Sequence, residues 1–175
     1  MTTGGPSLVV RLTLLAFWLG AATIFSAVVA PALFDVLPTR TLAGLVVGRV
    51  LPVIFYTGMA LAALDLLIEL RGARHVGRLM ADAAMLLTCA AAQFLVSPRI
   101  ERVRSAIAGP IEQLDPGDSR RLEFGRLHAV SVGLLGIAMI AALVTIIGLA
   151  RTMIGARDAR STPVPSNSLL TTDHA

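Results

Sequence analysis

Residues 12–34 read LTLLAFWLGAATIFSAVVAPALF and residues 127–150 read LHAVSVGLLGIAMIAALVTIIGLA, and neither stretch holds an acidic residue, a lysine or an arginine. The stretches are 23 and 24 residues long. A helix rises about 1.5 Å per residue, so about 20 apolar residues cross the hydrocarbon core of a bilayer. Because backbone amides in lipid must find their hydrogen bonds within their own segment, each stretch is predicted to be one membrane-spanning helix.

Two further apolar runs, residues 50–70 and residues 79–96, also approach the length of a span. Their acidic residues lie only near the short, arginine-rich turn of residues 72–78 that joins them, where the membrane surface is close. The sequence therefore predicts an all-α fold, an integral membrane four-helix bundle. The expected organisation is a short N-terminal tail at residues 1–8, a membrane domain at residues 9–151 with spans at about 12–34, 50–70, 79–96 and 127–150, and a disordered C-terminal tail at residues 152–175.

The composition agrees with a chain whose solvent is lipid. Of its 175 residues, 55% are hydrophobic and 15% are charged, and the mean hydropathy is +0.79. A soluble domain has about 25% charged residues, so an ordinary soluble enzyme and a disordered regulator are excluded. A single cysteine, Cys89, excludes a disulfide scaffold. The net charge of +4 comes from arginines placed mainly at the ends of apolar runs, so we expect no nucleic-acid partner.

The long connection of residues 97–125 is predicted to carry an amphipathic segment between the third and fourth spans. Its apolar residues recur at helical spacing among arginines: Ile100, Val103 and Ile107. Asp118 or Ser119 is expected to cap the start of the fourth span. The connection of residues 35–48 is either an interfacial helix or an extension of the second span.

Five short segments follow one another in an informative order: Phe17-Trp18-Leu19-Gly20, Val29-Ala30-Pro31-Ala32-Leu33-Phe34, Gly48-Arg49-Val50-Leu51-Pro52, Ser97-Pro98-Arg99-Ile100-Glu101 and, after Phe124, Leu127-His128-Ala129-Val130-Ser131. Together they resemble the transmembrane protein 205-like family, a domain of unknown function, over residues 9–150. The resemblance implies a small integral membrane protein of four helices and brings no established chemistry with it. We expect the chain in the inner (plasma) membrane of a bacterium.

The arginine distribution leaves the orientation in the membrane open. With four spans, both termini and the turn of residues 72–78 lie on one side, together with seven of the 15 arginines. The other eight lie on the opposite side, so the counts that the positive-inside rule compares are nearly equal. The density of arginine in the short turn favours the termini inside.

Asp65 is the most informative polar residue, because a carboxylate inside a span costs about 2.5–3.5 kcal/mol unless it is paired, hydrated or protonated. Glu69 follows one turn later on the same face, and Asp82 enters the third span from the same membrane side. Two interpretations stay open. The carboxylates either pair with arginines of the short turn and anchor a helical hairpin, or form a proton or cation site facing the bundle. The arginines available for such pairs are Arg71, Arg74 and Arg78.

At the opposite membrane side, His128 and Arg126 begin the fourth span, and Arg49 begins the second. His128 either binds a metal or haem, or hydrogen-bonds a backbone carbonyl or Glu101 and fixes the helix end. The second interpretation is favoured, because the other ligand candidates fall in other parts of the predicted topology: His75, His174 and Cys89. We therefore expect no metal and no cofactor.

The sequence holds no P-loop, nucleophile elbow, HExxH or CxxC motif. The predicted function is a non-enzymatic membrane component or partner subunit, in contact with the bilayer and with a second copy or another membrane protein. The alternative is a transporter or channel for a small ion or a soft-metal complex, with a carboxylate site near Asp65.

Two backbone features of the spans are also predicted to matter. Pro31 and Pro52 are expected to bend the first and second spans, because proline removes a helical hydrogen bond. Gly44 and Gly48 form a GxxxG motif, which allows two helices to approach closely.

Overall fold

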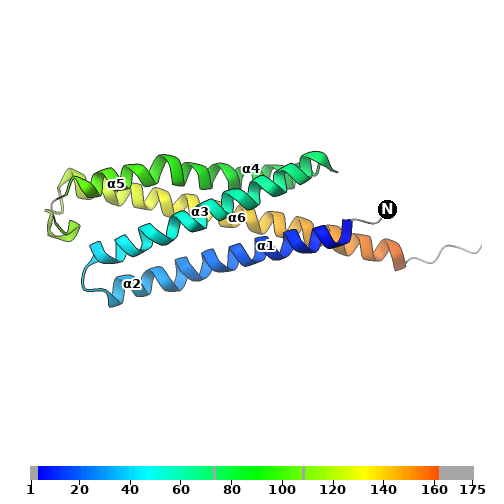
Figure 1. The fold of residues 1–175 in the computed structure, drawn as a ribbon, viewed down its shortest axis with the longest axis horizontal. Helices are drawn as coiled ribbons and strands as arrows, with labels where there is room; N and C mark the ends of the chain where they lie inside the picture. Colours follow the sequence, from blue (N-terminus) through cyan, green and yellow to red (C-terminus); the bar gives the residue numbers. More distant parts are fainter. Residues whose placement is uncertain (1–3, 73, 108, 162–175) are drawn as a thin grey trace, which may run out of the picture.

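The computed structural model describes residues 4–72, 74–107 and 109–161, and nearly all of them are helical. Figure 1 shows long helical rods packed along one another. One end of the bundle holds the starts of α1 and α4 and the ends of α3 and α6, and the other holds the α2–α3 turn and the α5–α6 connection. The elements are α1 (Gly4–Ile24), η1 (Phe25–Val29), α2 (Ala30–Val36), α3 (Arg40–Arg71), α4 (Val76–Ala90), η2 (Ala91–Val96), α5 (Ser97–Ser105), η3 (Ile111–Gln113) and α6 (Ser119–Ser161).

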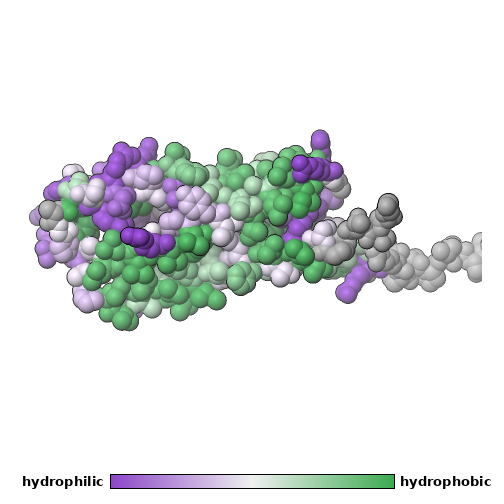
Figure 2. Space-filling view, viewed as in Figure 1, coloured by the Kyte–Doolittle hydropathy of each residue, from purple (hydrophilic) through white to green (hydrophobic). Residues whose placement is uncertain are grey.

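The four rods are long and apolar enough to cross a membrane: Ser7–Val36, Arg40–Arg71, Val76–Ser105 and Ser119–Arg157. Figure 2 shows hydrophobic residues over the middle of the bundle and hydrophilic residues gathered over the α5 end. Bulky apolar side chains point outward, such as Phe17 at 77% exposed and Ile140 at 65%. Such a surface suits lipid rather than water. The predicted all-α four-helix fold is confirmed, and the chain is an integral multi-pass membrane protein.

The helices run further than the spans predicted from the sequence. Helix α1 already begins at Gly4, within the tail predicted for residues 1–8. Helix α6 continues through Ser161, so the tail predicted for residues 152–175 starts too early. Residues 151–161 are rich in arginine and alanine, which extend an existing helix at little cost. Residues 1–3 and 162–175 lie outside the described residues.

The connections also join the helices more directly than the sequence required. Helix α3 begins at Arg40, so most of the segment 35–48 extends the second span, which was one of the two alternatives. The amphipathic segment is present as α5, which continues the third rod without a break. Its Val103 is buried, as the helical spacing predicted.

Two of the rods contain a π-helical turn immediately before a proline. The turn η1 precedes α2, which has Pro31 in its first turn, and η2 precedes α5, which has Pro98 there. Within η2 the bonds run five residues back, and the amide of Ser97 donates to the carbonyl of Ala92. The wider turn lets the helix pass a residue that has no amide hydrogen. Pro52 lies inside α3, which stays helical on both sides of it.

The core is tightest where α1 and α4 approach Gly58 of α3. A β-carbon at Gly58 would lie 2.8 Å from the Trp18 ring and 3.0 Å from the Cys89 sulfur, so only glycine fits. Trp18 Nε1 donates a hydrogen bond of 2.9 Å to the carbonyl of Ile54. The two glycines of the predicted GxxxG motif differ: a β-carbon at Gly44 would meet no described atom within 4 Å, whereas one at Gly48 would lie 3.1 Å from Arg104 Nη2.

Side chains of the α5–α6 connection fix the starts of two helices. Thr41 donates a 2.9 Å hydrogen bond to Glu112 Oε2 and accepts one of 3.2 Å from the amide of Ile111, which ties η3 to α3. Burial alone would raise the pKa of Glu112, but hydrogen bonds from backbone amides and from Thr41 hold it below its ordinary value. Asp118 accepts a 2.8 Å bond from the amide of Arg120 and so caps α6, as one of the two predicted caps.

Candidate functional site

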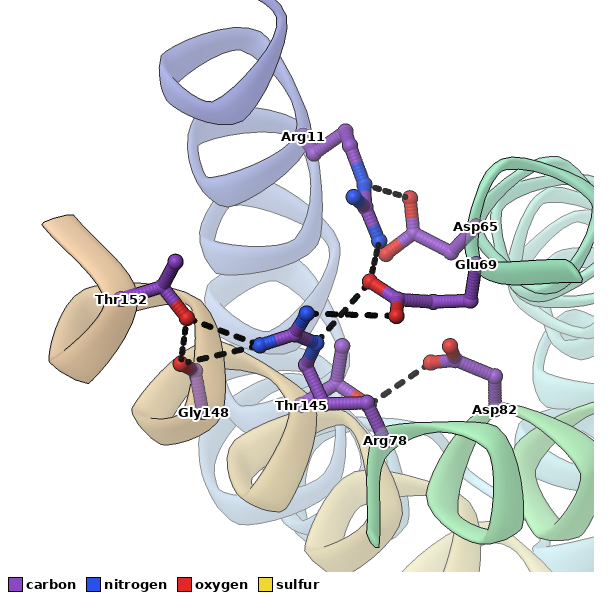
Figure 3. Close-up of polar contacts among 8 residues, drawn as sticks. All are labelled: Arg11, Asp65, Glu69, Arg78, Asp82, Thr145, Gly148 and Thr152. Atoms are coloured by element: carbon purple, nitrogen blue, oxygen red, sulfur yellow. Dashed lines mark hydrogen bonds and ion pairs between the residues drawn. The ribbon is translucent and has the colours of Figure 1, made fainter. Parts of the chain in front are cut away.

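The candidate site is a buried cluster of charged side chains near the end of the bundle where α1 begins (Figure 3). Three helices supply its charges, and we call these five residues the charge cluster: Arg11 from α1, Asp65 and Glu69 from α3, and Arg78 and Asp82 from α4. All five are less than 9% exposed. Charged side chains are so rarely buried unless they are paired that their partners decide what the cluster can do.

Arg11 joins the first span to the second by pairing with both carboxylates of α3. Its Nε lies 2.9 Å from Asp65 Oδ1, and its Nη2 lies 3.0 Å from Glu69 Oε1. The two acidic residues are four positions apart and therefore share one face of the helix. One guanidinium thus offsets the repulsion between two carboxylates that lie one turn apart.

Arg78 joins α3 to α4 and α6. Its Nε and Nη2 donate to the two oxygens of Glu69 at 2.9 and 3.2 Å, a bidentate pair, and its Nη1 donates to Thr152 Oγ1 at 2.9 Å. The aliphatic part of Arg78 packs against Gly148 of α6, where a β-carbon would stand 2.9 Å from its Cγ. Because Gly148 has no side chain, Arg78 can pack against α6 while its guanidinium bonds to Glu69.

Asp82 is fully buried and, within the described part of the chain, has no arginine as a direct partner. Its Oδ1 accepts a 2.7 Å hydrogen bond from the hydroxyl of Thr145 on α6. Its Oδ2, like the Oδ2 of Asp65, has no hydrogen-bond partner among the described residues. The cluster thus sets two guanidinium groups against three carboxyl groups, and two carboxyl oxygens stay available for a proton, a water molecule or a small cation.

A small cavity of about 290 Å³ opens beside the cluster, between α1 and α3. Arg11, Asp65 and Ser7 line it together with aliphatic side chains from both helices. Asp65 is therefore reachable from the surface between the first two rods. Asp82 does not line this cavity.

The structure brings the three predicted carboxylates together but changes their partners. Arg78 pairs with Glu69, as one interpretation required. The other two expected partners do not take part: Arg74 donates to the carbonyl of Leu70, and Arg71 is exposed with no ion pair in the described structure.

Arg11 and Thr145 were missed. Arg11 interrupts the apolar start of the first span and lies, in a four-span topology, on the same membrane side as Asp65, which was a usable signal. Nothing in the apolar run around Thr145 marks that hydroxyl.

The comparisons with known proteins place the chain in a family. The family model of a domain of unknown function (DUF4149) matches residues 13–108, more than half of the chain. The chain belongs to the DUF4149 family. An uncharacterized protein of Aquifex aeolicus (strain VF5) is 36% identical over 96 residues, which are 54% of this chain and 69% of that relative. No solved structure matches.

The DUF4149 match covers only part of the charge cluster. It includes the acidic residues of α3 and both charged residues of α4, but it begins two residues after Arg11 and ends before α6. The arginine of the first span and the hydroxyl of Thr145 are therefore features of this DUF4149 chain outside the matched segment.

At the other end of this DUF4149 protein, the predicted residues do not form one site. His128 stacks on Phe124, one turn earlier in α6, with ring centroids 6.3 Å apart, and has no hydrogen bond to Glu101 or to a carbonyl in the described structure. The predicted hydrogen bond from His128 to a carbonyl or to Glu101 was therefore wrong. Glu101 instead forms an ion pair of 3.3 Å with Arg104. Arg49 and Arg126 are exposed.

The side chains that could ligate a metal ion do not lie close together in the described structure. Among the described residues, no three side chains of histidine, cysteine, aspartate or glutamate are arranged to hold a metal ion. Cys89 is buried against Gly58 and Trp18 in the core, and His75 lies in the turn before α4. His174 lies outside the described residues.

Proposed function

We propose that this DUF4149 chain is a non-enzymatic component of a bacterial inner (plasma) membrane and works as a subunit, by packing its spans against another membrane helix. The observation that supports this most directly is a polar pair in the middle of two spans. Tyr56 of α3 is 49% exposed, and its hydroxyl accepts a 3.3 Å hydrogen bond from the amide of Gln93 in η2.

Polar groups at this depth favour contact with a further helix. Tyr56 stands near the middle of the rod Arg40–Arg71, and Gln93 near the middle of Val76–Ser105. The tyrosine hydroxyl still has a hydrogen to donate. In hydrocarbon there is no water to accept it, so side-chain hydrogen bonds between helices stabilise association, by about 1 kcal/mol each.

The charge cluster fits the same proposal. Its arginines and most of its carboxyl oxygens bond to one another across α1, α3, α4 and α6, so the cluster holds the bundle together. A membrane subunit needs such a fixed bundle to present one face to its partner.

The test is photocrosslinking in the native membrane with p-benzoylphenylalanine at position 53, because Val53 is exposed and lies one helical turn before Tyr56. We expect a crosslink to a second copy or to another membrane protein, and we expect its yield to fall several-fold in the Tyr56→Phe background. Position 17 is the matched control, because Phe17 is also an exposed apolar residue on a span. Equal crosslinking at positions 53 and 17, or only lipid adducts at both, would contradict the proposal.

A second candidate function is a transporter or channel for a small ion or a soft-metal complex. It is supported by the unpartnered Oδ2 atoms of Asp65 and Asp82 and by the cavity that reaches Asp65. The test is flux into proteoliposomes, scanning protons, monovalent cations and soft metals, for the wild type and Asp65→Asn. Flux that is lost in Asp65→Asn but kept in Asp35→Asn would favour transport; flux no greater than in empty liposomes would exclude it.

We also propose kinship with the transmembrane protein 205-like family. Four of the five segments that carry the resemblance fall inside the matched residues 13–108, and the segment around His128 falls outside them. A family member whose fourth span lacks the spacing from Phe124 to Ser131 would argue against this kinship.

A further inference from the structure

A pocket lies at the α5 end of the bundle, at the opposite end from the charge cluster. Its volume is about 550 Å³, within the range of ligand sites in proteins. Residues from α2, α3, α5, α6 and the turn around η3 line it. Charged residues of its lining stand at the starts of α3 and α6, and apolar residues such as Leu51 and Pro52 stand further along.

Arg104 is a partly buried cation of this pocket, and most of its donors are unoccupied in the described structure. Its guanidinium lies against the bare backbone of Gly48, where a β-carbon would stand 3.1 Å from Nη2. In the described structure its one ion-pair partner is Glu101, at 3.3 Å, and the Glu101 side chain is 66% exposed. A guanidinium has five N–H donors, so most of those of Arg104 are left for a ligand.

Two other charged residues of the lining are already hydrogen-bonded, whereas Arg40 is exposed and its side chain has no hydrogen bond or ion pair among the described residues. Arg121 donates a 2.8 Å hydrogen bond to the carbonyl of Leu114, and Glu112 accepts from Thr41. Counting Arg40 and Arg104 as well, three arginines face two glutamates, so the pocket is cationic. An anionic group with several acceptor oxygens is the complementary ligand.

Ser131 supplies a second, independent sign of a missing ligand. It lines the pocket, is 1% exposed, and its Oγ has no hydrogen-bond partner among the described residues. It is the lining residue of α6 furthest from the helix start, ten residues beyond Arg121, which is about 15 Å along the helix. A buried hydroxyl at that depth calls for an acceptor on a molecule that enters from the charged end.

We propose that this pocket binds an anionic membrane phospholipid, with the phosphate on Arg104 and a lipid ester carbonyl accepting from Ser131. The pocket has the polarity of such a molecule, charged near the helix starts and apolar further along the spans. Phe34 of α2 lines it and is 39% exposed, so the apolar part continues onto the lipid-facing surface where acyl chains lie. A soluble phosphate would leave that apolar part of the lining without a partner.

Native mass spectrometry of the purified protein in a mild detergent, titrated with phosphatidylglycerol, tests the proposal. We expect Arg104→Gln to weaken binding about tenfold or more and Ser131→Ala to weaken it several-fold. Arg102→Gln is the matched control, because Arg102 lies on the same helix, is exposed and is not part of the pocket lining. Glycerol 3-phosphate serves as the soluble probe.

The outcomes separate the sources of the phosphate. Tight phosphatidylglycerol binding that Arg104→Gln weakens and Arg102→Gln keeps, with glycerol 3-phosphate bound weakly, supports a lipid site. Glycerol 3-phosphate bound as tightly as the lipid overturns the lipid assignment. Equal binding by the two arginine variants, or no binding by the wild type, overturns the site.

If Arg104→Gln does not fold, Gly48→Ala replaces it. The added methyl group would stand 3.1 Å from Nη2 of Arg104 and would narrow the pocket beside the guanidinium, so we expect weaker phosphatidylglycerol binding. Gly133→Ala is the matched control, because a β-carbon there meets no described atom within 4 Å and the residue does not line the pocket. Equal binding by the two alanine variants overturns the role of Arg104.

Discussion

The two ends of the bundle use arginine in opposite ways. At the end where α1 begins, Arg11 and Arg78 are almost buried and bond to carboxylates on another helix. At the α5 end, the one ion-pair partner of Arg104 among the described residues is Glu101, an exposed glutamate three residues earlier on the same helix. An arginine that pairs across helices fixes their packing, whereas one that pairs within its own helix remains available to a ligand.

The same contrast appears in two hydroxyl groups of α6. Thr145 and Ser131 are each 1% exposed. The hydroxyl of Thr145 donates to Asp82 at 2.7 Å, whereas that of Ser131 has no hydrogen-bond partner in the described part of the chain. Of these two buried hydroxyl groups, one donates its hydrogen within the protein, and the other keeps a hydrogen that a ligand can accept.

The largest effect is expected from Arg78→Gln. Removing this guanidinium leaves Glu69 with one arginine partner and breaks the contact with α6, so we expect a loss of about 3–5 kcal/mol in the free energy of unfolding. Reversible unfolding in mixed detergent micelles measures it. Arg71→Gln is the control and should change stability by less than about 0.5 kcal/mol, because Arg71 is exposed. Similar losses in both variants would mean that the cluster does not lock the bundle.

A double-mutant cycle on Arg11 and Asp65 sharpens the comparison. With Nε and Oδ1 only 2.9 Å apart and both side chains buried, we expect a coupling energy of roughly 2–3 kcal/mol between Arg11→Gln and Asp65→Asn. The same cycle on Arg104 and Glu101 should give about 0.5 kcal/mol or less, because the Glu101 side chain is 66% exposed. Equal coupling at the two ends would remove the distinction between them.

The two hydroxyl groups provide the next test. Thr145→Val leaves an Asp82 oxygen without its donor, and we expect it to cost about 1–2 kcal/mol. Ser131→Ala removes a hydroxyl that bonds to no described residue, so lipid-free protein should keep its stability or gain slightly. Unfolding in detergent checks both, and a clear loss in lipid-free Ser131→Ala would show that this hydroxyl does have a partner.

The smallest effect concerns the cap of α6. The side chain of Arg120 and its amide hydrogen-bond to Asp118 and lower the pKa of that carboxyl to about 2, from 3.8. Because the folded value lies below the unfolded one, the stabilisation is complete above about pH 4 and is lost as the pH falls through about 2. Asp118→Ala should therefore lower the unfolding midpoint much more at pH 6 than at pH 2. A difference that is the same at both pH values would exclude the charge of Asp118 as the cause.

The fold was predictable because the length of each apolar run can be read directly from the sequence. Residues 12–34 and 127–150 fix two spans by hydropathy alone, and the acidic residues of the other two runs lie close to a turn. The helix ends were less predictable, since α6 continues through Ser161 on helix-forming residues that hydropathy does not mark.

The site was predictable in part, for a physical reason. A carboxylate within a span has a high free-energy cost, so Asp65, Glu69 and Asp82 could be recognised as candidates from the sequence. Their partners depend on which helices pack together, which hydropathy does not show. The packing places Arg11 beside Asp65 and Thr145 beside Asp82. The pocket residue Ser131 follows the same rule, because a lone hydroxyl in an apolar run says nothing about which groups surround it.

The π-helical turn η2 also acts as an angular adjustment within the third rod. Each helical residue turns the chain by about 100°, so a turn that accommodates one extra residue rotates everything after it by that amount. Helix α5 follows η2 directly, and the direction in which Arg104 points is set by this rotation. Regular α-helical bonding across Ala91–Val96, with the same number of residues, would therefore turn the arginine away from the pocket. Deleting one residue there would restore the α-helix and leave α5 facing the same way.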